Sequence, residues 1–358
     1  MLLNFVHQPN RRISGSCRVS SSASSGLPPN PGSPSNGTSD QKPPTLPKHL
    51  SPSSIEAWKQ CPLVFRSRYI DKIKEPPTTA LARGIAAHDG LEKLYTTVPP
   101  RERTVDVLHN LFRAAWGGMR KEERYQPLFA GDLEQERAWG LESLQLLAEY
   151  FDLEDPATVS PLQCEKWLSA EFSADESTER AAAAVAQEGA EERMSALRED
   201  ARRTKVVGVL DRIDRDPQTG HLVVVDYKTG KAPNIDKYAA ATQARIIDEK
   251  FFQLRVYAIL VQRATGELPK ELRLLFLGSG DDIRMRMRAE DAERTRAEVL
   301  DVWAAVVAAV EKDDFRCHNP AACPYCSGRW VRPWDNRAPL TTTERAPAEG
   351  GGVSPPAS

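Results

Sequence analysis

The residues that could do chemistry lie in two neighbouring segments, VVGVLDRID at 206–214 and LVVVDYKTG at 222–230. Each has the apolar pattern of a β-strand, and the residues between them favour a turn, so the pair is predicted to form an antiparallel hairpin. Alternation along the second strand sends Asp226 and Lys228 to one face, where they meet Asp211 of the first strand. Two carboxylates and an ammonium group therefore converge.

This cluster suits the chemistry of a divalent metal ion. Two carboxylates at a sheet edge can bind Mg²⁺ or Mn²⁺ through oxygen while water remains on the metal, and such a water becomes a nucleophile. Lys228 could orient that water or offset the charge that grows on a phosphodiester in the transition state. The alternative is an exposed hairpin whose acidic and basic side chains form surface ion pairs, which stabilise a fold little.

The segments GVLDRID (208–214) and VVDYKTG (224–230) resemble the two signature motifs of the PD-(D/E)XK nuclease superfamily, in the RecB-like branch with its AddB-like and Cas4-like exonucleases. The resemblance covers roughly residues 50–330. It implies an α/β fold with a restriction-endonuclease-like core, in which helices flank a mixed central β-sheet and a helical insertion is added. It also implies an Mg²⁺-dependent deoxyribonuclease, with Asp211 and Asp226 as metal ligands and Lys228 as the residue that assists water.

Further residues match this family pattern. RGIAAHDGLE at 83–92 resembles the helical motif that supplies a metal-binding histidine, His88, although a histidine on an apolar helix face is more often a packed core residue. Gln253 and Tyr257 share one face of a predicted helix at 239–264 and resemble the QxxxY motif that positions the lysine and DNA. The alternative for that pair is chance spacing.

A glutamate from a predicted strand at 161–172 often joins the site in this family. Both Glu165 and Glu171 lie in that segment. The sequence leaves the choice between them open, and surface glutamate is the alternative for each.

Four of the six cysteines form a second possible metal centre: Cys61, Cys317, Cys323 and Cys326. The spacing of the last three suits metal thiolates. Cys61, predicted to lie on a helix, resembles the distant first ligand of the iron–sulfur staple in AddB-type and Cas4-type nucleases, which implies a [4Fe–4S] cluster. The order of the two gaps is reversed relative to that family, which leaves Cys317 in doubt. Zinc held by Cys323, Cys326 and either His318 or Cys61 is one alternative, and thiols without metal are the other.

Charge and composition limit the function classes. The 48 Lys and Arg residues against 50 Asp and Glu give a net charge of −2, so contact with DNA must come from a local patch. Residues 1–47 are rich in serine, proline and arginine, which predicts an organellar transit peptide and a disordered linker, with the chloroplast favoured over the mitochondrion; an ordinary disordered tail is the alternative. No segment is long and apolar enough to span a membrane.

The remaining chain is predicted to form one nuclease domain at 48–335, followed by a disordered tail at 336–358. Helices are expected at 52–65, 79–95, within 101–152 and at 289–311, with further strands at 272–277 and 283–287. The domain would contain a low-complexity insertion at 173–203 and a cysteine-rich loop at 317–330. Strict alternation in the first strand of the hairpin places Arg212 on the side of Leu210.

The favoured function is an exonuclease that acts on single-stranded DNA ends in repair or recombination, as in relatives that trim DNA. No G-x-x-x-x-G-K-[ST] loop occurs, so helicase activity would belong to a separate partner. Two other classes compete with this interpretation. One is a catalytically weak nucleic-acid-binding module of the same fold, and the other is a zinc-stapled structural protein.

Overall fold

The computed structural model of the protein describes residues 44–173, 202–317 and 323. The predicted transit segment up to residue 43, most of the predicted insertion, Cys326 and the predicted tail lie outside the described residues. Among the helices that the structure describes, none combines the length and apolar composition needed to cross a membrane.

The helices begin where the sequence provides caps. Ser51 starts the first helix, because its side chain accepts a hydrogen bond from the Ser54 amide in a capping box. Thr78 and Thr104 cap the third and fourth helices, because their side chains accept hydrogen bonds from the amides of Leu81 and Val107. The long helices are α1 (Pro52–Gln60), α3 (Thr79–Thr96), α4 (Val105–Met119), α5 (Leu133–Leu153), α7 (Ala240–Thr265) and α8 (Ala289–Lys312). The short ones are α2 (Pro62–Phe65), the π-helical turn η1 (Arg66–Ile70), and the 3₁₀ turns η2 (Pro100–Glu102) and η3 (Glu123–Phe129).

The sheet has five strands in the order β1-β2-β3-β4-β5. The strands are β1 (Gln163–Ser173), β2 (Arg203–Arg215), β3 (Leu222–Lys228), β4 (Glu271–Phe276) and β5 (Asp281–Arg286). Strands β3 and β4 pair in parallel, and the other neighbours are antiparallel. The predicted β2–β3 hairpin and the mixed sheet are confirmed.

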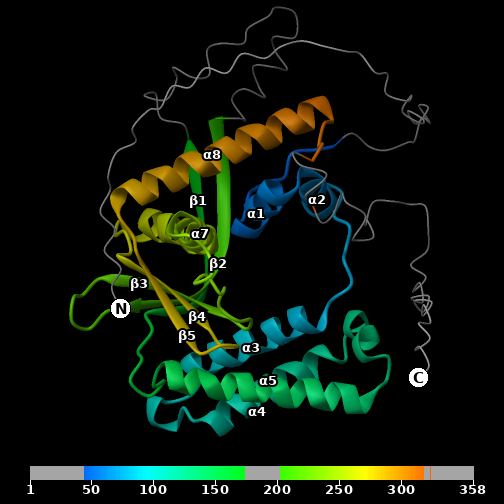
Figure 1. The fold of residues 1–358 in the computed structure, drawn as a ribbon, viewed down its shortest axis with the longest axis vertical. Coiled ribbons are helices and arrows are strands. Elements are labelled where there is room, and N and C mark those ends of the chain that lie inside the picture. Colours follow the sequence, from blue (N-terminus) through cyan, green and yellow to red (C-terminus); the bar gives the residue numbers. More distant parts are fainter. Residues whose placement is uncertain (1–43, 174–201, 318–322, 324–358) are drawn as a thin grey trace, which may run out of the picture. The chain divides into compact units, whose positions relative to one another are not determined.

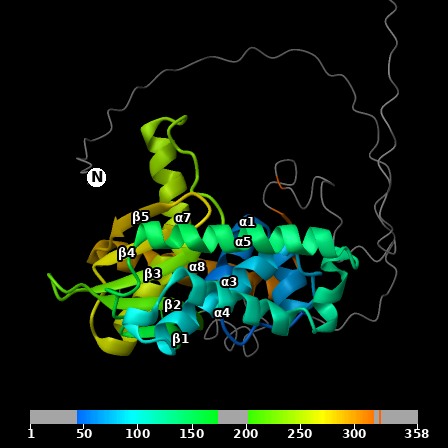
Figure 2. The same ribbon diagram turned by 90° about the horizontal axis from the view of Figure 1, so that it is seen from below.

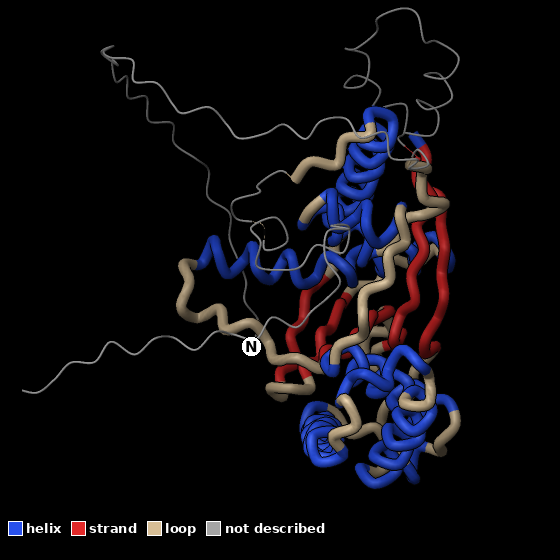
Figure 3. The backbone as a smooth tube through the Cα atoms, turned by 90° about the vertical axis from the view of Figure 1, so that its right-hand side faces the viewer, coloured by secondary structure: helices blue, strands red, loops and turns tan. Residues whose placement is uncertain are grey.

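Helices cover both faces of the sheet, as the predicted α/β class requires. Figure 1 shows α7 and α8 on one side and α3, α4 and α5 on the other, and Figure 3 shows the strands between these two groups of helices. Figure 2 shows α3, α4 and α5 side by side. Strand β3 is buried on both faces: Val224 packs into the core with α7 and α8, whereas Val223 and Val225 pack into the core with α3 and α5. The strand is apolar from Leu222 to Val225 because it lies between two helical layers.

The outer ribbon of β1 and β2 departs from strict alternation at one point. Glu165 has a left-handed φ of 44°, which is unfavourable for a residue with a side chain. Leu210 packs in the core with α7, but Arg212 reaches Tyr95 and Tyr150 on the opposite side, so the prediction that Arg212 shares a side with Leu210 is wrong. The local distortion moves the Arg212 side chain to the other face of β2, and the hydrophobic pattern of the sequence does not indicate it.

Strands β2 and β3 separate beyond the pair Arg212 and Val225, where their ladder ends. We call this point the strand fork. Nearer its start, β2 pairs instead with Leu50, whose amide donates to the Lys205 carbonyl at 2.8 Å. Past the fork, β3 continues along β4 to Lys228. The fork therefore opens the sheet beside Asp211 and Asp226.

Helix α7 packs against β2 at a glycine. A methyl group added at Gly208 would lie 2.7 Å from Cε1 of Tyr257, closer than carbon atoms approach one another. Tyr257 is itself buried and cannot move into solvent without leaving the core. The close packing of α7 on β2 thus depends on the absence of a side chain at residue 208.

We predict that Gly208→Ala lowers the free energy of unfolding by about 1–3 kcal/mol, because the added methyl group overpacks the contact with Tyr257. Urea denaturation followed by circular dichroism measures this loss. Gly140→Ala in α5 is the matched control, since nothing lies within 4 Å of a methyl group there. It should be neutral or stabilising by up to about 1 kcal/mol through helix propensity. Equal effects of the two substitutions would contradict the packing account.

Candidate active site

Asp226 is a carboxylate buried at the strand fork. It is 1% exposed, and Lys228 Nζ lies 2.7 Å from its Oδ2 atom. Burial and the nearby charge of Asp211 raise the pKa of Asp226 to about 6, although Lys228 opposes the shift. Burial would lower the pKa of Lys228, but Asp226 raises it overall. The predicted meeting of an acid and a base at the end of β3 is present.

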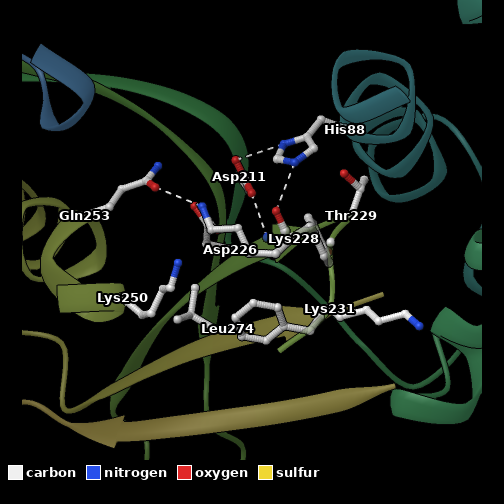
Figure 4. Close-up of a pocket in the computed structure, with 12 residues that line it drawn as sticks. His88, Asp211, Asp226, Lys228, Thr229, Lys231, Lys250, Gln253 and Leu274 are labelled. Atoms are coloured by element: carbon white, nitrogen blue, oxygen red, sulfur yellow. Dashed lines mark hydrogen bonds and ion pairs between the residues drawn. The ribbon is translucent and has the colours of Figure 1, made fainter. Parts of the chain in front are cut away.

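Lys228 is held in place from helix α7. Its Nζ donates to Gln253 Oε1 at 2.9 Å (Figure 4). Gln253 Nε2 in turn donates to the Tyr257 hydroxyl at 2.8 Å. Burial raises the pKa of Tyr257, so this hydroxyl stays neutral and can accept. The two residues that the sequence placed on one helix face thus form a chain of hydrogen bonds to the lysine.

His88 reaches the site from α3 on the other side of the sheet. Its Nε2 lies 3.1 Å from the Tyr227 carbonyl oxygen, and its Nδ1 lies 3.3 Å from Asp211 Oδ1 (Figure 4). Burial would lower the pKa of His88, but the Asp211 and neighbouring carboxylates raise it to about 9. If Nε2 donates to the carbonyl, the ring is fixed with Nδ1 toward the carboxylates, which is the orientation of a metal ligand.

Asp211 lies between these groups. Its Oδ2 accepts a hydrogen bond from the Tyr227 amide at 2.9 Å, in the place where a ladder bond between β2 and β3 would otherwise continue. Its other oxygen faces His88. The side chain of Asp211 therefore connects β2 to β3 just beyond the strand fork, and it also forms part of the site.

The structure distinguishes Glu165 from Glu171. Glu165 Oε1 lies 4.0 Å from His88 Nδ1, and one ligand atom each from Glu165, His88 and Asp211 lie within 4.8 Å of one another. Burial and Asp211 raise the pKa of Glu165 to about 7. Glu171 is exposed farther along β1, paired with Lys205. Glu165 is thus the glutamate that lies at the site.

These residues fit a divalent cation. Nitrogen and carboxylate oxygens converge from three elements, and Asp226 Oδ2 is buried without an aligned hydrogen-bond donor among the described residues. Asp226 is outside the tight group of Glu165, His88 and Asp211, since it turns toward Lys228. A hard cation prefers such oxygen-rich sites and tolerates one imidazole.

A pocket of about 380 Å³ opens over the site. His88, Asp211, Asp226 and Lys228 line it, and Lys231 and Lys250 stand at its border in Figure 4. The lysines provide the local positive charge that the near-neutral chain lacks as a whole. An anionic substrate could therefore approach the carboxylates once a cation is bound.

A buried arginine network behind the site has no counterpart in the sequence predictions. Arg212 is fully buried and forms an ion pair with Glu154 and a second one with Asp214 at 3.0 Å. Its guanidinium also donates to the Tyr227 hydroxyl at 2.7 Å, directly between the two functional residues of β3. The signal that could have found it is a charged residue at a position that the alternation of Val206, Gly208 and Leu210 assigns to the core.

Three of the predicted cysteine ligands come together at the other end of the domain. One ligand atom each from Cys61, Cys317 and Cys323 lie within 4.8 Å of one another. Cys61 sits in extended conformation between α1 and α2, not within a helix as expected. Cys317, which the reversed spacing left in doubt, lies with the other two. Cys326 is outside the described residues.

The family model described as the PD-(D/E)XK nuclease superfamily matches residues 49–331. The chain belongs to the PD-(D/E)XK nuclease superfamily. Membership supports a hydrolytic nuclease with a nucleic-acid substrate and divalent-metal chemistry. The match spans the strands, α7 and the cysteine segment, so the candidate site of this PD-(D/E)XK protein lies within it.

Two solved structures are similar to this PD-(D/E)XK chain. One is a protein of Eubacterium rectale that carries the name "Putative exonuclease", with 13% identity, a TM-score of 0.44, and coverage of 82% of this chain and 91% of the other. The second is the protein SSO0001, with 12% identity, a TM-score of 0.28, and coverage of 76% and 91%. No protein with a curated description is significantly similar to the chain.

We predict that Glu154→Gln costs about 3 kcal/mol of unfolding free energy near neutral pH and flattens its dependence on pH. Although burial opposes it, the hydrogen bond and charge of Arg212 lower the pKa of Glu154 to about 2 from an ordinary 4.5. A carboxylate whose pKa is lowered by folding stabilises the protein fully at a pH above its pKa in the unfolded chain. This stabilisation is lost as the pH falls through its pKa in the folded protein. Urea titrations between about pH 6 and pH 3 should therefore show a steeper loss for the wild type.

Glu149→Gln is the control for that comparison, since Glu149 lies near the end of α5, shortly before Glu154. This variant should keep the wild-type dependence of stability on pH. A Glu154→Gln protein whose stability falls with pH as steeply as the wild type would show that the buried ion pair does not carry this linkage.

Proposed function

We propose that this PD-(D/E)XK protein hydrolyses DNA phosphodiester bonds with Mg²⁺ or Mn²⁺, acting as an exonuclease on single-stranded ends in repair or recombination. The observation that carries the proposal is the convergence of two sets of side chains at the strand fork. One set, His88, Glu165 and Asp211, can hold a cation, and the other, Asp226 and Lys228, pairs an acid with a positioned ammonium.

A divalent cation bound there would polarise the phosphodiester and activate water. His88, Asp211 and Asp226 would hold it, and Glu165 joins them from β1. His88 can do so only with Nδ1 unprotonated, so a bound cation and a proton shared between His88 Nδ1 and Asp211 Oδ1 would exclude each other. Asp226 contributes a buried carboxylate whose charge the cation would neutralise.

Lys228 contributes a directed positive charge. Its Nζ donates to Gln253 and lies 2.7 Å from Asp226 Oδ2, and the ammonium lines the pocket. A preorganised ammonium can orient the attacking water or stabilise the negative charge that develops on the phosphate. Because Gln253 is fixed by Tyr257, Lys228 needs little reorganisation to do this.

A binding module that kept the fold and lost catalysis is the competing function. Such a module needs neither the ordered Lys228–Gln253–Tyr257 chain nor the buried Asp226. Burial of the Asp226 carboxylate costs free energy, and the hydrogen-bonded chain fixes the position of Lys228. Both features are present. They favour the enzyme. Any helicase that supplies single strands would be a separate protein.

A [4Fe–4S] cluster at the cysteines belongs to the same proposal, with zinc as the alternative metal. The support is the approach of Cys61, Cys317 and Cys323 to one another from the two ends of the domain. Cys326 would supply the fourth thiolate. A cluster here would tie the segment after α8 to the junction of α1 and α2, and thereby connect distant parts of the chain.

We predict that Asp226→Asn and Lys228→Ala both abolish most cleavage but fail in different ways. Asp226→Asn removes a charge that a hard cation needs, so Mg²⁺ affinity and turnover should fall together. Lys228→Ala leaves the carboxylates in place, so Mg²⁺ should still bind while turnover falls by about 10²–10³-fold. Calorimetric titration of Mg²⁺ and single-turnover cleavage of end-labelled single-stranded DNA separate the two.

The controls are Asp236→Asn and Lys237→Ala, which make the same changes at exposed positions after β3. Both should cleave like the wild type. Undiminished digestion by pure Asp226→Asn or Lys228→Ala protein would refute the nuclease mechanism and favour the binding module.

We further predict that anaerobically purified protein is brown and contains iron, and that Cys61→Ser loses the iron and unfolds at lower temperature, because metal binding in such sites is coupled to folding. Iron analysis and thermal denaturation measure both effects. Cys164→Ser is the matched control, because Cys164 packs in the other core near α3 and should leave the iron content unchanged. Colourless protein with stoichiometric zinc would contradict the cluster.

A further inference from the structure

An exposed apolar surface adjoins the active site on the outer ribbon. Trp167 of β1 is 56% exposed, and its cross-strand partner Val209 of β2 is 42% exposed. Leu168 and Phe172, which alternate with Trp167, pack toward α7, so Trp167 projects from the opposite face of the ribbon. A tryptophan left this open forgoes much of the burial that normally stabilises it.

This surface runs directly into the site. Val209 is two residues from Asp211 and Trp167 two residues from Glu165, a rise of about 7 Å along each strand. Val209 and Asp211 lie on either side of Leu210, whose side chain packs in the core with α7, so they share the face that turns away from α7. The exposed pair Trp167 and Val209 therefore lies one step along the ribbon from the cation ligands.

Helix α3, which carries His88, also has exposed apolar side chains. Leu81 is 54% exposed and Ile85 is 39% exposed, and both share a helix face with His88 at spacings of seven and three residues. We call Trp167, Val209, Leu81 and Ile85 the apolar border. Isolated exposed apolar residues are ordinary, but residues that flank one site from three elements indicate a binding surface.

The side chains next to the apolar border indicate the chemistry of the partner that binds there. Lys205 Nζ lies 6.0 Å from the centre of the Trp167 ring, so an aromatic face and a positive charge are offered together. An unpaired nucleotide has the matching pair of features, a base that stacks and a phosphate that is anionic. Bases within a duplex are already stacked on each other and cannot use an isolated tryptophan without unpairing.

We propose that Trp167 stacks on the base of a single-stranded nucleotide next to the scissile phosphate and so makes the enzyme select unpaired strands. This rests on the proposed nuclease function and specifies its substrate. Stacking on an aromatic side chain does not read a sequence, because every base has a flat face. The selection is therefore for unpaired structure, not for a particular base.

The test compares Trp167→Ala, Trp167→Phe and the wild type, each combined with Lys228→Ala to slow cleavage. Binding is measured by fluorescence anisotropy with Mg²⁺, using a labelled thymidine oligonucleotide and an abasic oligonucleotide of equal length and charge. Trp167→Ala should weaken binding of the thymidine oligonucleotide roughly 5- to 150-fold. Trp167→Phe should restore most of it, and abasic binding should change little.

Leu133→Ala at the start of α5 is the control, because Leu133 is 69% exposed but is not a residue of the apolar border. It should change neither affinity. Equal weakening of both oligonucleotides by Trp167→Ala, or none of either, would overturn the stacking proposal while leaving the nuclease assignment intact. A Trp167→Ala protein that changes its sedimentation from oligomer to monomer would also overturn it, since the surface would then serve self-association. Absence of Mg²⁺-dependent cleavage by the wild type would instead refute the proposed function.

Discussion

The site depends on one electrostatic constraint, a buried carboxylate beside a second one. Asp226 is almost fully buried, and the charge of Asp211 lies close enough to help raise its pKa to about 6. Two such groups cannot both remain charged in a protein interior unless positive charge is supplied. Lys228 meets Asp226, and His88 meets Asp211. A divalent cation would complete the neutralisation that these two residues begin.

The scaffold explains how these charges are held. Lys228 is connected through Gln253 to Tyr257, and the ring of Tyr257 packs on β2 where Gly208 leaves room for it. Behind β3, Arg212 holds the Tyr227 hydroxyl and Glu154. The strand that carries Asp226 and Lys228 is thus fixed on both faces, by a neutral chain from α7 and by a buried ionic network. Such support keeps reacting groups within a narrow range of positions.

The sequence predicted what depends on local spacing. Asp226 and Lys228 are two residues apart on one strand, and Gln253 and Tyr257 are four apart on one helix, so their shared faces follow from regular geometry. The sequence could not decide between Glu165 and Glu171, because regular alternation places both on the same face of one strand. The register of β1 with β2 brings Glu165, not Glu171, beside Asp211. The side of Arg212 was predicted wrongly because β2 departs from strict alternation between Leu210 and Arg212, at the point where the β1–β2 pairing skips Glu165 and Asp211. Its partner Glu154 is distant in sequence, and no local pattern connects them.

The account stands on metal-dependent hydrolysis at the strand fork. The most direct measurement is digestion of end-labelled single-stranded, duplex and circular single-stranded DNA by the pure protein, with Mg²⁺ and with EDTA. The account predicts that the linear single strand is shortened from an end, that the circular strand survives, and that EDTA stops the reaction. Failure to cleave any of the three substrates with Mg²⁺ or Mn²⁺, by protein that is folded and binds the metal, would contradict it.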